Sequence, residues 1–317
     1  MRALVLTAGL GTRLQPLTLA RAKAAAPVDG EPLARRTIRW LVSQGFTDLV
    51  LNLHHRPESI TAAVGDGGDL GARVRYSWES PVLGSAGGPR HALPLLLDRG
   101  ADETFVLVNG DTLTNVDVGR LLHAHERSGA LVTMAVIPNA EPAKYGGVVV
   151  DNLGTVTGFT RAGSTEPSFH FIGVQVVEGA AFVSLPDNMP AESVKDVYPA
   201  LIAARPGSIR AFITDAEFFD IGTPRDYFDT CMRFRAKEPA GSRLRSPGSR
   251  VEDAIVWDDV HIDPQAQLRR CIVTDGVRVP RGSWENMIIR HANGDLAANE
   301  QRVDDLAIAS IDGSPLR

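Results

Sequence analysis

The sequence predicts an α/β protein whose main domain is a doubly wound, mostly parallel sheet, followed by a small C-terminal module. Three observations support this prediction. Apolar, β-rich runs alternate with segments of helical periodicity through the first half of the chain, a pattern typical of βαβ units. A cluster of Pro, Gly and Ser then interrupts the chain near residues 238–250, and beyond it apolar residues recur every six positions.

The elements of the first half are expected in alternating order. Strands are predicted at residues 3–7, 48–53, 74–78, 104–109 and 131–137. Helices are predicted at residues 33–44, 57–64, 89–97 and 118–127. Ligands of such sheets bind beyond the carboxyl ends of the strands. The loops after Thr7, Trp78 and Asn109 are therefore expected to surround one crevice.

The second half of the chain is expected to be less regular. Glycines punctuate short extended runs over residues 145–177, which predicts antiparallel strands that cover the crevice. Residues 238–250 are predicted to be a linker between a main domain, residues 1–237, and a module, residues 251–317. In that module Val256, Ile262 and Leu268 follow the six-residue interval, which indicates a short left-handed hexapeptide β-helix. An irregular strand pair is the alternative.

Composition excludes several classes of function. The chain has 317 residues, 44% hydrophobic and 22% charged, and a formal net charge of −5. Without a basic surface it is not expected to bind nucleic acid, and no segment is apolar for long enough to span a membrane. Cys231 and Cys271 fit neither a disulfide framework nor a zinc site. A cytoplasmic protein is expected.

The most informative segment is LVLTAGLGTRLQPLTLARAK, residues 4–23. A buried strand leads into Gly9 and Gly11, which allow the backbone to approach a ligand and present N–H groups to phosphate oxygens. Arg13 offers a guanidinium fork for phosphate and Lys23 a point charge. Position 14 is leucine and no Gly-Lys-Ser/Thr follows, so neither a dinucleotide fingerprint nor a P-loop fits. The predicted nucleotide-binding residues of this segment are Leu6, Ala8, Gly9, Gly11 and Thr12.

This segment resembles the signature of the sugar-nucleotide pyrophosphorylases, and the resemblance extends through most of residues 1–235. It depends on Gly9, Gly11-Thr12-Arg13-Leu14, Pro16-Leu17-Thr18, Lys23 and Pro27-Val28. It implies a Rossmann-like, GT-A-type domain that condenses a nucleoside triphosphate with a sugar 1-phosphate and releases pyrophosphate. Mannose-1-phosphate guanylyltransferases are the most similar in character. The family's usual Pro-Lys-Pro here reads Ala22-Lys23-Ala24.

A second segment, residues 79–88, resembles the family's Leu-Gly-Thr-Ala-Gly stretch, which lines the nucleobase pocket. Glu79, Gly84 and Ser85 are the residues carried over. A carboxylate only accepts hydrogen bonds, so Glu79 suits the adjacent N1–H and 2-amino donors of guanine. This favours GTP. Uracil and thymine stay open, because an acceptor can also take their single N3–H.

Two aspartates are predicted to hold magnesium. Asp111 ends Val108-Asn109-Gly110-Asp111 and resembles the family's Gly-Asp motif, and Asp220 belongs to a segment resembling its Asp-Ile-Gly-Thr-Pro motif. Two carboxylates give a hard oxygen site that Mg²⁺ can share with triphosphate oxygens and water. Taken singly, each aspartate is also compatible with a turn or a helix N-cap.

The sugar side departs from the family pattern. Tyr145, Gly146 and Gly147 resemble its Tyr-Gly-Val strand, and His170 lies where members commonly read Asn-Ala-Gly. The usual Glu-Lys pair after a phenylalanine is missing, and Arg161 stands there instead. A guanidinium suits a phosphate dianion, so Arg161 is the candidate ligand of the sugar phosphate. A solvated surface arginine is the alternative.

The expected reaction is an in-line attack of the sugar phosphate oxygen on the α-phosphorus. The nucleophile is already an anion, so catalysis requires positioning and charge neutralisation rather than a general base. Arg13 is expected to stabilise the leaving pyrophosphate and Lys23 the α-phosphoryl region or the sugar phosphate. The alternatives are a uridylyl- or thymidylyltransferase of glucose, muramate or heptose 1-phosphate, and a catalytically silent regulatory subunit. The C-terminal module suggests a homo-oligomer.

Overall fold

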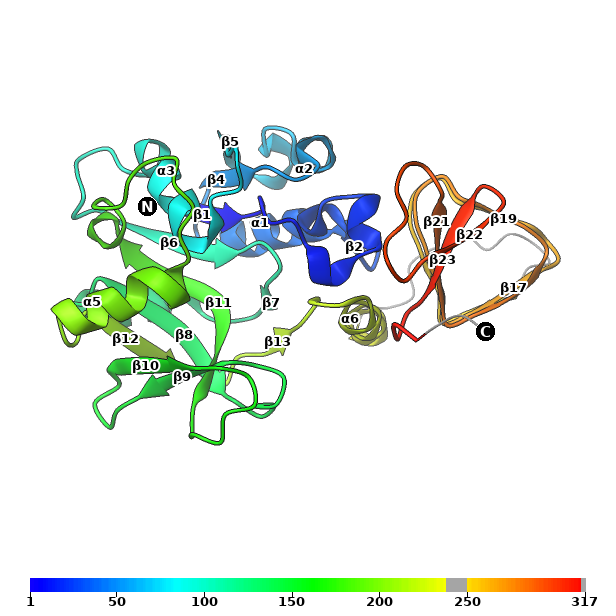
Figure 1. Ribbon diagram of the computed structural model, residues 1–317. Helices are drawn as coiled ribbons and strands as arrows, with labels where there is room; N and C mark the ends of the chain where they lie inside the picture. The colour runs from blue at the N-terminus through cyan, green and yellow to red at the C-terminus, as the bar shows by residue number, and fades with distance from the viewer. Residues whose placement is uncertain (238–249, 315–317) are drawn as a thin grey trace. The chain divides into compact units, whose positions relative to one another are not determined.

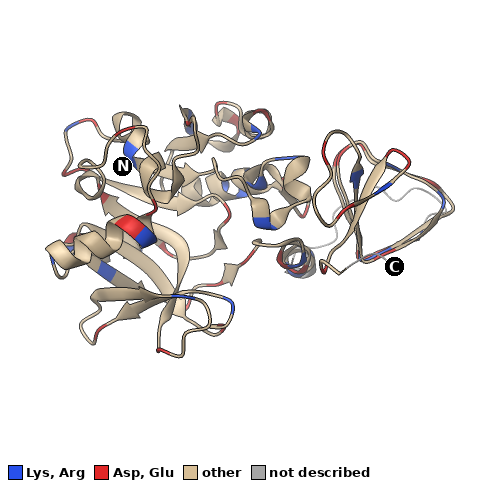
Figure 2. Cartoon of the chain, viewed as in Figure 1, with Lys and Arg blue, Asp and Glu red and all other residues tan. Residues whose placement is uncertain are grey.

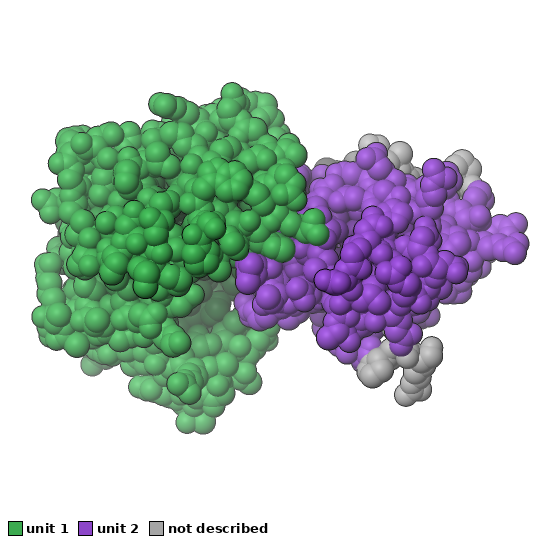
Figure 3. Space-filling model, turned by 45° about the horizontal axis from the view of Figure 1, so that its top comes forward, with its two compact units in different colours: residues 1–9, 34–219 green, residues 10–33, 220–317 purple. Residues whose placement is uncertain are grey.

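The computed structural model describes residues 1–237 and 250–314. Contacts divide the chain into two compact units, coloured green and purple in Figure 3. Unit 1 comprises Met1–Gly9 and Ala34–Phe219, and unit 2 comprises Leu10–Leu33 together with the described part of residues 220–317. The predicted linker lies outside the described residues, except for Arg250, which begins a strand. In this division residues 10–33 group with the C-terminal part, and the predicted domain boundary near residue 238 stays a prediction.

Unit 1 is built on a nine-stranded sheet of described residues with the order β10-β9-β11-β6-β1-β4-β5; in addition, β8 pairs with β11, and β12 pairs with β8 (Figure 1). β1 pairs in parallel with β4 and β6, and β4 with β5. Ala3, Leu4 and Val5 are fully buried, so both faces of β1 are covered, as expected for a doubly wound sheet. The strands are β1 (Ala3–Leu6), β4 (Asp48–Leu53), β5 (Arg73–Trp78), β6 (Thr104–Asn109), β8 (Val132–Pro138), β9 (Gly147–Val150), β10 (Val156–Thr160), β11 (Phe169–Glu178) and β12 (Ile209–Ile213).

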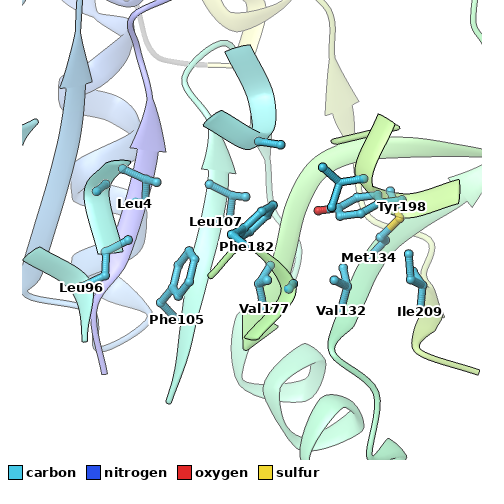
Figure 4. Packing of buried hydrophobic residues seen from close by; sticks show 14 of the residues in the cluster. Leu4, Leu96, Phe105, Leu107, Val132, Met134, Val177, Phe182, Tyr198 and Ile209 are labelled. Carbon is cyan, nitrogen blue, oxygen red and sulfur yellow. The ribbon is translucent and has the colours of Figure 1, made fainter. Parts of the chain in front are cut away.

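The helices of unit 1 alternate with these strands, which confirms the predicted α/β class. α3 and α5 lie on one face of the sheet, where they cover a cluster of buried apolar residues (Figure 4) that includes Leu4, Phe105 and Tyr198. The helices are α1 (Leu33–Ser43), α2 (Pro57–Val64), α3 (Gly84–Leu96), α4 (Val118–Ser128) and α5 (Tyr198–Ala204), with short helical turns at Gly68–Leu70, Gly179–Ala181 and Ser193–Val197.

Helix α3 begins earlier than the sequence predicted. It starts at Gly84, and Pro89 lies inside it instead of at its first turn. The backbone N–H groups of Ala86 and Gly87 donate to the carbonyl of Ala191 at 2.9 and 3.2 Å. N–H groups in the first turn of a helix lack partners within the helix. Here a segment distant in the sequence provides them, and no local pattern could reveal that.

Residues 145–177 form antiparallel strands, as predicted. These strands belong to the main sheet instead of forming a separate cover over the crevice. β11 pairs antiparallel with β6 and β8, and β9 pairs with β10. The register of β11 shifts between Phe171 and Gln175. Gly173 lies in this interval with φ +79°, and a Cβ there would meet Thr112 Oγ1 at 2.1 Å. Glycine is therefore required where β11 passes the end of β6.

Unit 2 contains the C-terminal module, whose strands stack in parallel ladders β14-β17-β20, β15-β18-β21 and β16-β19. Ile255 pairs with Ile272, and Leu268 with Trp284, which confirms a hexapeptide-type coil. The antiparallel strands β23 and β22 follow on β21. The strands are β14 (Arg250–Glu252), β15 (Ile255–Val256), β16 (His261–Ile262), β17 (Ala266–Arg269), β18 (Ile272–Val273), β19 (Arg278–Val279), β20 (Gly282–Glu285), β21 (Met287–His291), β22 (Gln301–Val303) and β23 (Leu306–Ser310).

Two of the three residues that follow the six-residue interval are buried, as the pattern predicted. Ile262 and Leu268 are 5% and 1% exposed, whereas Val256 is 37% exposed and its neighbour Ile255 is buried. Successive residues of a strand point to opposite faces. The inward position of β15 is thus one residue earlier than predicted.

The remainder of unit 2 is the segment of residues 10–33 and one helix. The segment contains 3₁₀ turns at Thr12–Leu14, Leu17–Leu19 and Lys23–Ala25, followed by β2 (Pro27–Val28) and β3 (Glu31–Pro32). Helix α6 (Pro224–Lys237) packs on β2. Tyr227 of this helix donates from its hydroxyl to the carbonyl of Pro27. These contacts explain why residues 10–33 group with unit 2.

Three global expectations can be compared with the described residues. No helix within residues 1–237 and 250–314 is long and apolar enough to cross a membrane. Cys231 and Cys271 are free and buried, and burial raises the pKa of Cys231 to about 12, so its thiol stays protonated. Basic and acidic residues are interspersed in both units (Figure 2), in keeping with the scattered charge of the sequence.

Candidate active site

The carboxyl edge of the sheet in unit 1 places Asp111. Leu6 at the end of β1 pairs with Asn109 at the end of β6. The N–H of Gly110 donates to the Leu6 carbonyl at 2.9 Å, and a Cβ on Gly110 would lie only 2.3 Å from that oxygen. Glycine is therefore required directly before Asp111. The aspartate follows immediately beyond the strand ends and is half-buried.

Asn52, near the end of β4, holds the loop that follows β1. It is 3% exposed. Its Oδ1 accepts from the backbone N–H groups of Thr7 and Ala8 at 2.6 and 3.3 Å, and its Nδ2 donates to Glu79 Oε1 at 2.6 Å. Sequence reasoning missed this residue. The available signal was a polar side chain inside an otherwise apolar strand, which a buried position tolerates only with partners.

Glu79 holds the loop that leads into α3. It is 3% exposed, and its second oxygen, Oε2, accepts from the N–H of Leu83 at 2.7 Å. A Cβ on Gly88 would lie 2.5 Å from Oε1, so α3 passes directly over the carboxylate. Both oxygens are engaged within the protein. These hydrogen bonds give Glu79 a role in fixing the loop, and its predicted contact with guanine stays a prediction.

Replacement of Glu79 by alanine is expected to lower the free energy of unfolding by about 2–3 kcal/mol, because buried donors on Asn52 and Leu83 lose a charged acceptor. Urea denaturation measures this change. Glu166→Ala is the matched control, since Glu166 is an exposed loop glutamate. Equal midpoints for the two variants would contradict the anchoring role.

A pocket of about 330 Å³ opens at the same edge of the sheet in unit 1. Ser85 forms one wall, and its hydroxyl donates to Glu192 Oε2 at 2.5 Å. Gln175 accepts from the Tyr198 hydroxyl at 2.8 Å; burial raises the pKa of Tyr198, so the phenol remains a donor. The lining residues are Leu6, Ser85, Asn109, Phe171, Gln175, Glu192, Ser193, Val194 and Lys195.

The pocket includes a cation that sequence reasoning missed. Lys195 lies on the turn Ser193–Val197, a five-residue π-helical segment, and lines the pocket together with Leu6 and Asn109. So short an irregular turn has no helical periodicity to recognise.

Part of the predicted sugar side gathers as an aromatic cluster in unit 1. The rings of Tyr145 and His170 lie 4.3 Å apart, and those of His170 and Phe218 lie 4.9 Å apart. A Cβ on Gly146 would lie 2.7 Å from the carbonyl oxygen of Thr160. A Cβ on Gly147 would lie 2.0 Å from Ser168 Oγ. Both positions therefore require glycine. Arg161 follows β10 in an exposed position.

In unit 2, the segment of residues 10–33 brings Gly11 close to Lys23. Gly11 has φ +60°, and a Cβ there would lie 2.7 Å from Thr18 Cγ2 and 3.4 Å from Lys23 Cβ. The Thr18 hydroxyl donates to the Gly11 carbonyl at 3.1 Å. The left-handed backbone and the close approach both require glycine. Thr12 and Arg13 follow on an exposed 3₁₀ turn.

Arg13 and Asp220 both approach another glycine of unit 2, Gly222. A Cβ on Gly222 would lie 3.5 Å from Arg13 Nη1 and 3.0 Å from Asp220 Oδ1. The carboxylate accepts from the N–H of Gly222 at 2.7 Å, and the Asp220 carbonyl accepts from the Thr230 hydroxyl at 2.6 Å. Unit 2 thus brings together Gly11, Arg13, Lys23 and Asp220. Unit 1 carries Leu6, Ala8, Gly9, Glu79, Gly84, Ser85 and Asp111.

Comparison with known families decides how this arrangement is classified. The family described as nucleotidyl transferase matches residues 2–237, and the family described as GlmU-like, C-terminal hexapeptide, matches residues 242–285. The chain belongs to the nucleotidyl transferase family. The first match covers every residue of the candidate site, and the second covers most of the parallel ladders.

Individual relatives of this nucleotidyl transferase carry two kinds of name. A mannose-1-phosphate guanylyltransferase of Mycobacterium tuberculosis is 28% identical over 88% of this chain and 81% of its own length. A UTP–glucose-1-phosphate uridylyltransferase of Synechocystis is 26% identical over 88% of this chain and 76% of its own length. The crystal structure of HddC from Yersinia pseudotuberculosis shares the fold, with 22% identity and a TM-score of 0.63 over 74% of this chain and 99% of that chain.

Asp111 in unit 1 and Asp220 in unit 2 are the two carboxylates predicted to hold magnesium, and that role stays a prediction. Within the described part of the chain, no group of three or more His, Cys, Asp or Glu side chains gathers as a metal cluster. Mg²⁺ is typically bound through one or two carboxylates together with substrate phosphates and water. Asp111 and Asp220 are carboxylates of this kind, and both are half-buried.

Proposed function

We propose that this protein transfers a nucleotidyl group from a nucleoside triphosphate, preferentially GTP, to a sugar 1-phosphate, preferentially mannose 1-phosphate, and releases pyrophosphate. The observation that carries the proposal is that Arg13 and Asp220 both lie beside Gly222. A guanidinium and a carboxylate beside the same glycine suit a triphosphate that binds together with its Mg²⁺ ion. A molecule that only bound a nucleotide would not need both.

The nucleotide end has the strongest support. Gly11 and Gly110 are both positions where a side chain would collide with neighbouring atoms, and both precede a residue of the proposed machinery. The strand before Asp220, β13 (Phe218–Phe219), pairs with β7 (Leu113–Thr114), which follows Asp111. We propose that both aspartates serve one Mg²⁺ ion.

The chemistry follows from charge. Bound magnesium neutralises charge on the triphosphate. Arg13 stabilises the pyrophosphate as its negative charge develops, and Lys23 holds the α-phosphoryl region or the incoming sugar phosphate. The sugar phosphate oxygen attacks the α-phosphorus in line, the bond from that phosphorus to the bridging oxygen of the leaving pyrophosphate breaks, and no proton has to be removed from the nucleophile.

The choice of base and sugar is supported by the guanylyltransferase relative. Glu79 contributes indirectly, because it fixes the loop that carries Gly84 and Ser85. The uridylyltransferase relative favours UTP with glucose 1-phosphate as the second candidate. Aromatic rings at Tyr145 and His170 are compatible with either sugar.

Pyrophosphate release tests the proposal. The full-length protein is assayed with magnesium, each of GTP, UTP, dTTP, ATP and CTP, and a panel of sugar 1-phosphates. We expect the highest kcat/KM with GTP and mannose 1-phosphate. A maximum with UTP and glucose 1-phosphate would establish the second candidate, and no release with any pair would refute the transferase function.

Besides Lys23, the sugar phosphate has two candidate cations in unit 1, Arg161 and Lys195. We expect Arg161→Ala to raise KM for the sugar 1-phosphate about tenfold, the effect of losing one charge-assisted hydrogen bond, while KM for the nucleotide changes little. Steady-state kinetics with either substrate varied measures both constants. Lys195→Ala is the parallel variant. An unchanged KM in Arg161→Ala together with a raised KM in Lys195→Ala would transfer the role to Lys195.

A further inference from the structure

Arg21, just before Lys23, forms an ionic anchor on the C-terminal module within unit 2. Its Nε and Nη2 donate to the two oxygens of Asp275, both at 2.6 Å, and Nη2 also donates to Asp258 Oδ2 at 2.5 Å. Burial by itself lowers the pKa of Arg21, but the hydrogen bonds with both aspartates outweigh it and raise that pKa. Bidentate pairing of this kind fixes geometry as well as charge.

The two aspartates come from successive coils of the module. Ile255 pairs with Ile272 on the adjacent coil, and Asp258 and Asp275 are separated by the same interval. The N–H of Asp258 also donates to Asp275 Oδ1 at 3.2 Å. Two stacked carboxylates repel each other unless a cation lies between them. Arg21 is that cation, so the aspartate pair and the segment of residues 10–33 depend on each other.

A second anchor holds the chain just after Lys23. Trp257 Nε1 donates to the Tyr227 hydroxyl at 3.0 Å, and that hydroxyl donates to the carbonyl of Pro27. Tyr227 is fully buried and Trp257 is 4% exposed. Burial raises the pKa of Tyr227, so the phenol keeps its proton and remains a donor. Trp257 also stacks under Arg21, whose Cζ lies 5.4 Å from the ring centroid.

Lys23 lies between these anchors on the 3₁₀ turn Lys23–Ala25. One turn of 3₁₀ helix has little stability of its own. The flanking residues Ala22 and Ala24 are alanines, which do not restrict φ as proline would. Both alanines are buried, at 0% and 2% exposure, so the turn is packed against its surroundings while the lysine is only half-buried. Tertiary contacts must therefore define where the lysine points.

We propose that the C-terminal module positions Lys23 for the transfer step through these two anchors, with Arg21, Asp258, Asp275 and Trp257 as positioning residues. This inference rests on the proposed function of Lys23. Trp257 and Asp258 are adjacent, so one coil of the module contributes a residue to each anchor. The module then belongs to the catalytic apparatus and is more than an appended packing domain.

The test is the double variant Asp258→Asn/Asp275→Asn in the full chain, which keeps side-chain volume and removes both charges. We expect kcat to fall about tenfold to a hundredfold, as for a small displacement of a catalytic group, with KM for the nucleotide within about twofold of the wild type. Glu285→Gln is the matched control, because Glu285 pairs with Arg269 across adjacent coils of the same module. Its kcat should equal that of the wild type.

Variants of Arg21 separate positioning from general stability. Lysine keeps the charge but cannot make the bidentate pair, so Arg21→Lys should recover part of the kcat that Arg21→Gln loses. If both variants and the double variant retain wild-type kcat, or if they lose activity only in proportion to the folded fraction measured by circular dichroism, the proposal is overturned.

Hydrogen exchange provides a readout that does not need activity. We expect amide exchange in the peptide of residues 17–27 to accelerate at least tenfold in Asp258→Asn/Asp275→Asn and to stay unchanged in Glu285→Gln, because the anchors raise the free energy of local opening. If the wild type shows no transferase activity, the proposed function fails, but accelerated exchange would still support the anchors. Unchanged exchange would overturn the inference whatever the activity.

Discussion

Replacement of Asp111 by asparagine is expected to slow turnover by about a hundredfold or more, comparable to the loss of one preorganised electrostatic group in other enzymes. Asparagine matches the size of the side chain and removes its charge. The close approach of Gly110 to the Leu6 carbonyl is preserved, so the fold should persist while affinity for magnesium falls. Magnesium titrations of pyrophosphate release measure both effects.

A double variant tests whether Asp111 and Asp220 serve the same ion. If they do, Asp111→Asn/Asp220→Asn should be little slower than either single variant, because residues that act as a unit show non-additive effects. Additive losses would indicate separate roles. Asp117→Asn is the control: Asp117 caps α4 by accepting from the N–H of Arg120 at 2.9 Å, and asparagine caps equally well. Near-wild-type turnover in Asp111→Asn would remove this residue from the metal site.

The sequence was sufficient for the elements whose formation depends on local pattern. β4 (Asp48–Leu53) and β6 (Thr104–Asn109) have the predicted bounds, because largely apolar runs of that length favour a strand that is buried on both faces. The placement of Gly110 before Asp111 follows from the same edge of the sheet. A motif at a strand end is thus predictable from the chain alone.

Roles that depend on partners distant in the chain could not be predicted from the sequence. Glu79 looked like a free acceptor, and only the structure shows Asn52 and Leu83 on its two oxygens. α3 begins at Gly84 because Ala191 accepts from its first turn. In the sequence Arg21 is one of several scattered cations, and only the structure shows that it pairs with Asp258 and Asp275. Each pairing joins residues that no periodicity connects.

The largest effect on stability is expected at the Arg290–Glu300 pair in the C-terminal module. Arg290 Nε donates to Glu300 Oε1 at 2.6 Å and Nη2 to Oε2 at 2.5 Å. The two side chains are 4% and 0% exposed. Further Arg290 N–H groups donate to the carbonyls of His291 and Asp295 at 2.8 and 2.9 Å. The Arg290 guanidinium therefore links the end of β21 to the residues that lead into β22.

Glu300→Ala should lower the free energy of unfolding by about 3–5 kcal/mol, because it leaves a buried guanidinium without its counter-charge. Chemical denaturation followed by tryptophan fluorescence reports this loss, since Trp257 and Trp284 both lie in the module. Replacing both partners, as in Arg290→Met/Glu300→Leu, should cost less than Glu300→Ala, because it removes the stranded charge as well as the pair. Glu285→Gln is the control, since its pair with Arg269 is exposed and exposed pairs contribute little. A double variant less stable than Glu300→Ala would mean that the loop depends on the hydrogen bonds of Arg290 to the backbone more than on the balance of charge.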